Sequence, residues 1–145
     1  MSELAMKAFG AAIGARCLGG EVIELIGDVG AGKTTLTKGI ATGLGIDEDV
    51  QSPSFTISRV YEARDNLRMV HYDFYRLKDA GIMRDELSET MSDSENITII
   101  EWSGIVDGVL PGDRLTINIQ SPTETSRQIE IMGRGDKSDR LVQGL

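Results

Sequence analysis

Apolar residues recur along the first part of this chain with a helical period. The positions that share one face are small or apolar: Leu4, Ala8, Ala11, Ala12, Ala15 and Leu18. This spacing predicts a helix from an N-cap at Ser2 to about Leu18, with one small-residue face, and Gly19-Gly20 ends it.

The next segments change from a strand pattern to a helix pattern. Residues 21–26 (EVIELI) are rich in β-branched residues and predict a short strand, and the glycine-rich GDVGAGKTT follows at once. A second helix is predicted from about Lys33 to Leu44, where Gly45 provides a C-terminal stop. Strand, glycine-rich turn and helix in this order indicate an α/β protein.

Short alternating runs occupy the rest of the chain. Thr56–Glu62 and Leu67–Tyr75 predict a hairpin across residues 63–66, and residues 77–91 are polar and partly helical. Further strands are predicted at Ile97–Trp102, Arg114–Gln120 and Arg127–Met132, with a polar tail from about residue 133. Because no internal repeat or linker is seen, we expect residues 1–145 to form a single domain. Its expected fold class is α/β, a mixed sheet, partly antiparallel, flanked by helices.

Residues 27–34 match the phosphate-binding pattern G-x-x-x-x-G-K-[ST] in full. The glycines let backbone amides wrap around phosphate oxygens, and the helix that follows adds the positive end of its dipole. Lys33 supplies a charge to the β- and γ-phosphates, and Thr34 places its hydroxyl on Mg²⁺. The predicted nucleotide-binding residues of this loop are Asp28, Val29, Gly30, Ala31, Gly32, Lys33, Thr34 and Thr35. An accidental match is the alternative, but the loop follows a predicted strand and opens a predicted helix.

Two carboxylates near predicted strand ends are candidates to act near the metal and the attacking nucleophile. Glu101 follows four buried-type residues in ITIIEW, where open α/β sheets place ligands. Asp73 stands in HYDFYR, whose period of two predicts a polar face carrying His71 and Asp73 and an aromatic, core-facing one carrying Tyr72. A surface carboxylate that caps a strand is the alternative for Glu101, and a structural hydrogen-bonding aspartate is the alternative for Asp73.

Three other side chains have simpler interpretations. His71 is the single histidine of the chain, and a structural role is favoured over that of a general base. Trp102 is interpreted as packing rather than as a platform for a nucleotide base. Cys17 falls in the predicted first helix and is also interpreted as packing.

Composition indicates the setting in which the protein works. The 145 residues suffice for one domain, and 40% of them are apolar and 26% charged. A formal net charge of −8 argues against direct clamping of nucleic acid. One cysteine excludes an intramolecular disulfide, and neither a membrane-length apolar run nor a secretory signal is seen, so we expect a cytoplasmic protein.

Four segments in order, GDVGAGKTT, SPSF, HYDFYR and EWS, resemble the TsaE (YjeE) family of bacterial tRNA threonylcarbamoyladenosine biosynthesis. The Gly-Val-Leu-Pro stretch at 108–111 and Arg127 also fit, so the resemblance extends from about residue 5 to 132. It implies a compact α/β P-loop fold, Mg²⁺-dependent ATP hydrolysis and action through the partner proteins TsaB and TsaD. The partners transfer the threonylcarbamoyl group, and the ATPase resets or activates their complex, so tRNA is involved only indirectly.

The resemblance also implies roles for individual residues. Lys33 and Thr34 keep their phosphate-loop roles, so Lys33 is a catalytic residue and Thr34 a metal ligand. Glu101 is expected as the second protein ligand to Mg²⁺ and as a catalytic residue. Asp73 is expected as a catalytic or water-positioning acid.

Other positions follow the family's pattern less completely. Residues 52–55 resemble a switch-like loop that faces the γ-phosphate, with Ser54 in place of the usual threonine. Trp102 is expected beside the nucleotide, and Arg127 is expected to contact it from the last strand. Met6 replaces a threonine that lies near the base in the family, so no contact to adenine is carried over from the first helix.

The nucleotide and the type of reaction are inferred partly from what the sequence lacks. The N-K-x-D segment that binds guanine in switch-type GTPases is missing, so ATP is expected. Residues 1–145 are therefore expected to form a single P-loop ATPase domain, whose α/β fold is a P-loop NTPase-like mixed sheet flanked by helices. A small-molecule kinase is one alternative, but residues 77–96 are acidic and do not suit a cationic lid over phosphates. A switch that binds nucleotide without hydrolysing it is the other alternative.

Overall fold

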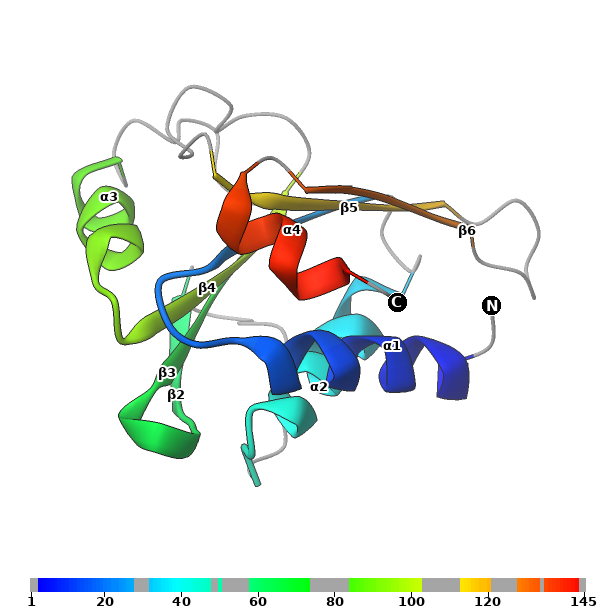
Figure 1. Cartoon of the computed structure of the whole chain (residues 1–145), viewed down its shortest axis with the longest axis horizontal. Helices are drawn as coiled ribbons and strands as arrows, with labels where there is room; N and C mark the ends of the chain where they lie inside the picture. The colour runs from blue at the N-terminus through cyan, green and yellow to red at the C-terminus, as the bar shows by residue number, and fades with distance from the viewer. Residues whose placement is uncertain are drawn as a thin grey trace.

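The computed structural model describes residues 3–27, 32–47, 50, 58–73, 84–102, 113–120, 128–133 and 135–143. Within these ranges, six strands form one sheet in the order β2-β3-β4-β1-β5-β6 (Figure 1). Four neighbouring strands are parallel: β3 (Arg68–Asp73), β4 (Asn96–Trp102), β1 (Val22–Gly27) and β5 (Leu115–Gln120). The edge strands β2 (Ser58–Glu62) and β6 (Gln128–Gly133) run antiparallel to their neighbours. The predicted mixed α/β sheet is therefore confirmed.

Helices cover both faces of this sheet. On one face, α1 (Glu3–Arg16) and α2 (Lys33–Gly43) run side by side, with α4 (Asp136–Val142) next to α1 (Figure 1). On the other face lies α3 (Arg84–Ser92), and a short 3₁₀ turn, η1 (Arg64–Asn66), joins β2 to β3. None of the helices in the described ranges is long and apolar enough to cross a membrane.

The main apolar core fills the space between the sheet and the pair α1 and α2. Alternate strand residues point into it: Ile23, Leu25, Met69, Ile97, Ile99, Leu115, Ile117 and Ile119. From α2, Leu36 and Ile40 meet them, and both are fully buried. Strands that are rich in such apolar residues and buried on both faces are typical of parallel sheets with helices on each side.

The face of α1 that packs differs from the small-residue face in the sequence pattern. Leu4 and Leu18 are 79% and 65% exposed, and Ala8 and Ala15 are exposed as well. The buried residues of this segment are instead Met6, Gly10, Ile13, Gly14 and Cys17. The pattern of alanines and leucines is therefore a wrong guide here, because glycine carries no apolar side chain and yet marks the closest contact.

The contact between α1 and α2 brings the two backbones together. Four glycines line it: Gly10, Gly14, Gly39 and Gly43. A Cβ atom at Gly14 would lie 2.1 Å from the carbonyl oxygen of Ile40, and one at Gly43 would lie 2.2 Å from that of Ala11. No side chain fits at such a distance, so the spacing of these helices depends on glycine. This seam fixes α2 against α1.

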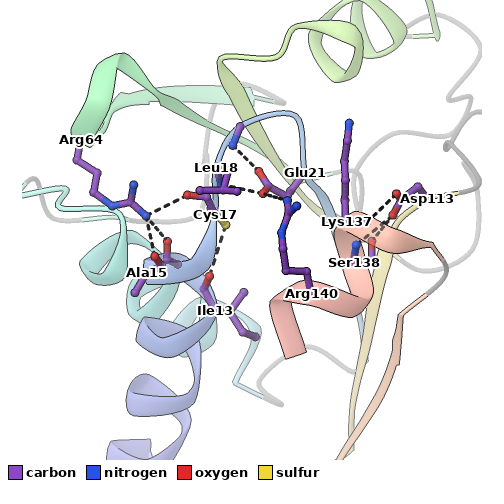
Figure 2. Close-up of polar contacts among 12 residues, drawn as sticks. Ile13, Ala15, Cys17, Leu18, Glu21, Arg64, Asp113, Lys137, Ser138 and Arg140 are labelled. Atoms are coloured by element: carbon purple, nitrogen blue, oxygen red, sulfur yellow. Dashed lines mark hydrogen bonds and ion pairs between the residues drawn. The ribbon is translucent and has the colours of Figure 1, made fainter. Parts of the chain in front are cut away.

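The end of α1 is also tied to the hairpin between β2 and β3. Figure 2 shows the Arg64 guanidinium pointing at the last turn of α1, where it donates to the carbonyl oxygens of Gly14, Ala15 and Cys17 at 3.0, 3.0 and 3.1 Å. Terminal carbonyls of a helix have no partner within the helix, and a cation is stabilised by the negative end of the helix dipole.

Cys17 is buried just beyond the end of α1, as the packing interpretation predicts. Its thiol donates to the carbonyl oxygen of Ile13 at 3.5 Å (Figure 2). Burial, together with the nearby Glu21 carboxylate, raises the pKa of this thiol to about 12. Because the thiolate is the reactive form, Cys17 is inert at neutral pH.

The segment after residue 133 contains a helix, so the prediction of a polar tail is wrong for residues 136–142. Leu141 of α4 is fully buried and anchors the helix to the core. The cap comes from far away in the chain, because Asp113 accepts hydrogen bonds from the backbone amides of Lys137 and Ser138, each at 3.1 Å (Figure 2). The Ser138 hydroxyl donates to the same carboxylate at 2.8 Å.

This capping contact predicts a pH-dependent loss of stability. Partial burial alone would raise the pKa of Asp113, but the hydrogen bonds from Ser138 and Lys137 hold it below its ordinary value of 3.8. The stabilisation of α4 by the Asp113 carboxylate is therefore complete above the pKa of this group in the unfolded chain. It is lost as the pH falls through the lower pKa of the folded state. We expect Asp113→Ala to lower the free energy of unfolding by about 1 kcal/mol at neutral pH, and the difference to shrink in acid.

Urea unfolding followed by circular dichroism, repeated between neutral pH and the acid range, measures this difference. Asp47→Ala removes an exposed aspartate beyond α2 and serves as the control. If Asp113→Ala unfolds at the same urea concentration as the wild type at every pH, the cap does not stabilise α4.

Candidate functional site

The described part of the phosphate loop places Lys33 over the end of β1. Gly32 is the N-cap of α2, and Lys33 is its first residue and is only 5% exposed. The Lys33 ammonium donates to the carbonyl oxygen of Gly27, the last residue of β1, at 2.7 Å. The predicted nucleotide-binding residues Asp28, Val29, Gly30 and Ala31 lie outside the described residues.

Two glycines of the pattern occupy positions that other residues would not tolerate. Gly27 has a φ of 154°, and a Cβ atom there would lie 2.2 Å from the carbonyl oxygen of Ile119 on β5. Gly32 has a φ of 106°, in the left-handed region that disfavours L side chains. The chain can therefore leave β1 close to β5 and enter α2 only with glycine at both ends of the loop.

The start of α2 points its backbone amides toward the loop. The first helical hydrogen bond runs from the amide of Leu36 to the carbonyl of Gly32, so the amides before Leu36 lie at the positive end of the dipole. Thr34 and Thr35 follow Lys33 in this first turn and are half-buried. Such an arrangement attracts anions, phosphate above all.

Glu101 lies at the carboxyl end of β4, between β1 and β3. Its Cα pairs with that of Leu25 on one side and that of Asp73 on the other. The residue is 3% exposed, so the alternative of a surface carboxylate is wrong. Its Oε1 atom lies 3.3 Å from the hydroxyl of Thr37 on α2, which also donates to the carbonyl oxygen of Lys33 at 2.9 Å.

Thr37 links Glu101 to the metal-binding position predicted in the phosphate loop. Thr34 precedes it by three residues, and residues at this spacing lie next to each other on one side of a helix. The hydroxyl of Thr34 and the carboxylate of Glu101 therefore belong to the same end of α2, although they come from distant parts of the sequence.

His71 lies beside Glu101 in the interior. Its Nε2 atom is 3.2 Å from Glu101 Oε1, and the residue has no exposed surface. The predicted polar face of β3 is therefore wrong, because His71 and Met69 lie buried on the side of α2. The opposite face is covered as well, since the hydroxyls of Tyr72 and Thr90 on α3 share a hydrogen bond of 2.9 Å. Both faces of β3 are covered because helices pack on each side of the sheet.

The structure places the other predicted site residues to different degrees. The backbone of Asp73 ends β3 next to Glu101, and that of Trp102 ends β4 opposite Ile26. The side chains of Asp73 and Trp102 lie outside the described residues, as do residues 52–55 and Arg127. Their predicted roles stay predictions.

The donor atoms at this site suit a magnesium ion that is shared with phosphates. Thr34 and Glu101 offer a hydroxyl and a carboxylate, and Mg²⁺ prefers such oxygen ligands, with water and phosphate oxygens completing its shell. Within the ranges described, no three His, Cys, Asp or Glu side chains gather into a metal cluster. The hydroxyl of Thr34 and the carboxylate of Glu101 are by their chemistry suitable ligands for a Mg²⁺ ion that also binds phosphate.

Comparison with known proteins decides the family. The profile of the family described as "Threonylcarbamoyl adenosine biosynthesis protein TsaE" matches residues 1–129. The chain belongs to the TsaE family. This result confirms the resemblance carried by GDVGAGKTT, SPSF, HYDFYR and EWS.

Individual TsaE proteins are similar over most of the chain. The tRNA threonylcarbamoyladenosine biosynthesis protein TsaE of Bacillus subtilis is 36% identical over 126 residues, which cover 87% of this chain and 78% of the relative. The protein of the same name from Streptomyces coelicolor is 34% identical over 123 residues, covering 81% and 83%. The crystal structure of Bacillus subtilis YdiB superposes with a TM-score of 0.78 at 31% identity, covering 99% of this chain and 88% of that one.

Sequence reasoning missed two buried polar groups of this TsaE protein. Thr37 could have been found from its spacing, because it lies one helical turn beyond Thr34. The second group is on the other face of the sheet, where Glu24 of β1 accepts a hydrogen bond from the Arg114 side chain at 2.9 Å and another from Thr116. Its signal was a glutamate in the middle of the apolar run EVIELI.

Proposed function

We propose that this TsaE protein binds Mg²⁺–ATP at the N-terminus of α2 and hydrolyses it. The observation that carries the proposal is the meeting of three parts at one end of the sheet. Lys33 lies over the end of β1, the first turn of α2 offers its amides, and Glu101 reaches the same helix through Thr37. Clefts outside the carboxyl ends of parallel strands are the usual ligand sites of open α/β sheets.

Each residue has a defined task in this proposal. Lys33 neutralises the β- and γ-phosphates, and the amides of the loop bind their oxygens. Thr34 and Glu101 hold Mg²⁺, which when bound neutralises charge that develops on the triphosphate. Asp73 positions the attacking water, and it ends the strand next to Glu101. Phosphoryl transfer requires little else of a protein than positioning and electrostatic stabilisation.

We further propose that hydrolysis serves tRNA threonylcarbamoyladenosine biosynthesis in the cytoplasm. Support comes from membership of the TsaE family and from relatives that carry this name. In the proposal, TsaB and TsaD transfer the threonylcarbamoyl group, and ATP hydrolysis here resets or activates their complex. The net charge of −8 agrees with contact to tRNA through these partners.

The proposal predicts that TsaB and TsaD stimulate ATP hydrolysis by this protein and that its binding to them depends on the nucleotide. The purified chain should bind ATP in calorimetry with Mg²⁺ and hydrolyse it slowly, and addition of TsaB and TsaD should raise the release of phosphate. Retention of the chain on immobilised TsaB and TsaD should differ between ATP, ADP and nucleotide-free buffers.

The alternatives give other results in the same assays. A switch that does not hydrolyse ATP leaves the nucleotide intact with Mg²⁺ and both partners present. A small-molecule kinase transfers the γ-phosphate to an added metabolite in stoichiometric amounts instead of to water. Calorimetry without heat from any nucleotide at millimolar concentration would contradict both alternatives and the proposal.

A further inference from the structure

Two buried side chains approach the same oxygen atom of Glu101. His71 Nε2 on β3 lies 3.2 Å from Oε1, and the Thr37 hydroxyl on α2 lies 3.3 Å from it. His71 and Thr37 have no exposed surface. The Glu101 carboxylate is therefore contacted by a side chain of the neighbouring strand β3 and by a side chain of α2.

The burial of His71 requires a partner for its ring nitrogens. Neither nitrogen has an aligned hydrogen bond within the part of the chain that the structure describes. A buried polar atom without such a bond costs about 1–3 kcal/mol, so an unpaired imidazole in the core calls for a reason. Glu101 Oε1 lies within ion-pair distance of Nε2, and only the alignment falls short of a hydrogen bond.

We propose that His71 and Thr37 are positioning residues that orient the Glu101 carboxylate toward the metal. Both groups act on Oε1, so Oε2 would be the oxygen available to a metal ion. The inference rests on the proposed function, since it assigns a purpose to these contacts only if Glu101 is a metal ligand. Neither residue touches the nucleotide or the metal itself.

Thr37 adds a connection to the phosphate loop. A hydroxyl has one proton, and Thr37 shares it between Glu101 Oε1 and the carbonyl oxygen of Lys33 one turn earlier. Through Thr37, the position of the Glu101 carboxylate is fixed relative to the first turn of α2, which carries Thr34. Thr37 and Glu101 are 64 residues apart in the sequence, so their contact joins the helix that carries Thr34 to the strand that carries Glu101.

The test separates the contribution of the metal from that of the nucleotide. Binding of a non-hydrolysable ATP analogue is measured by calorimetry in Mg²⁺ and in EDTA, and the ratio of the two dissociation constants gives the gain from the metal. We expect His71→Leu to reduce this gain about 10-fold and to leave the constant in EDTA unchanged. Thr37→Val should act in the same direction, and His71→Gln, which keeps a donor near the Nε2 position, should restore most of the gain.

Two matched variants control for disturbance of the core. Met69→Leu changes a buried residue two positions before His71 on the same face of β3. Thr98→Val removes a buried hydroxyl from β4, as Thr37→Val does from α2, but on the face of the sheet away from Glu101. Both should keep the wild-type gain from Mg²⁺, and thermal unfolding checks that every variant is folded.

Each result bears on a different statement. If the wild type gains from Mg²⁺ and His71→Leu and Thr37→Val gain as much, the positioning role is overturned while Mg²⁺–ATP binding stands. A loss of affinity in EDTA equal to that in Mg²⁺ makes the role merely structural and also overturns it. If the wild type itself gains nothing from Mg²⁺, the proposed function fails first, and the inference fails with it.

Discussion

Lys33→Ala is expected to reduce ATP hydrolysis by about 100- to 1,000-fold, a typical loss when one preorganised electrostatic contact to the transition state is removed. The reason lies in the position of this side chain. It is almost fully buried at the first residue of α2, and its ammonium is held above the end of β1 by the Gly27 carbonyl. Release of phosphate with TsaB and TsaD present is the measurement.

Lys38→Ala provides the matched control for this variant. It removes a lysine from the same helix, five residues beyond Lys33, and should keep hydrolysis within about twofold of the wild type because Lys38 is not part of the phosphate-binding pattern of residues 27–34. Circular dichroism should show that both variants are folded. Hydrolysis at the wild-type rate by Lys33→Ala would mean that the phosphates bind elsewhere.

Gly14→Ala is expected to destabilise the protein by about 2 kcal/mol or more, although alanine is the better helix former. Helix propensity alone predicts a gain of about 1 kcal/mol for this change. The added methyl group, however, would lie 2.1 Å from the carbonyl oxygen of Ile40, an atom of the α2 backbone that cannot rotate away. α1 and α2 must then separate, which exposes the core between them. The free energy of unfolding in urea measures the effect.

Ala8→Gly tests the opposite change on the exposed face of the same helix. It should cost about 1 kcal/mol through propensity alone, because Ala8 is exposed to solvent. The two variants together separate intrinsic helix preference from contact across the seam. Stabilisation by Gly14→Ala would contradict the close approach of the two backbones.

Local signals in the sequence predicted most of the fold. The run EVIELI, the glycines that follow it and Gly45 placed β1 and α2 within a residue or two of their observed ends. Such elements are decided by nearby residues, through side-chain period and backbone freedom. The hairpin between β2 and β3 was predicted for the same reason.

The features that the sequence did not predict depend on contacts between distant segments. α4 is capped by Asp113 and anchored by Leu141, and its own residues read as a polar tail. At the site, the carboxylate of Glu101 could be predicted from its place after a buried strand. The contacts that His71 and Thr37 make with this carboxylate could not, because the order of β3 and β4 in the sheet and the side of α2 that meets them follow from the assembled fold.

The glycine seam between α1 and α2 determines how a displacement of one helix affects the other. Repacking between helices normally absorbs small displacements through side chains that change rotamer. Between Gly14 and Ile40, and between Gly43 and Ala11, backbone meets backbone, and no rotamer exists to absorb a shift. A displacement of α2 would therefore move α1 with it as a rigid body. The exposed Leu4, in the first turn of α1, and Leu18, just beyond its end, would move as well.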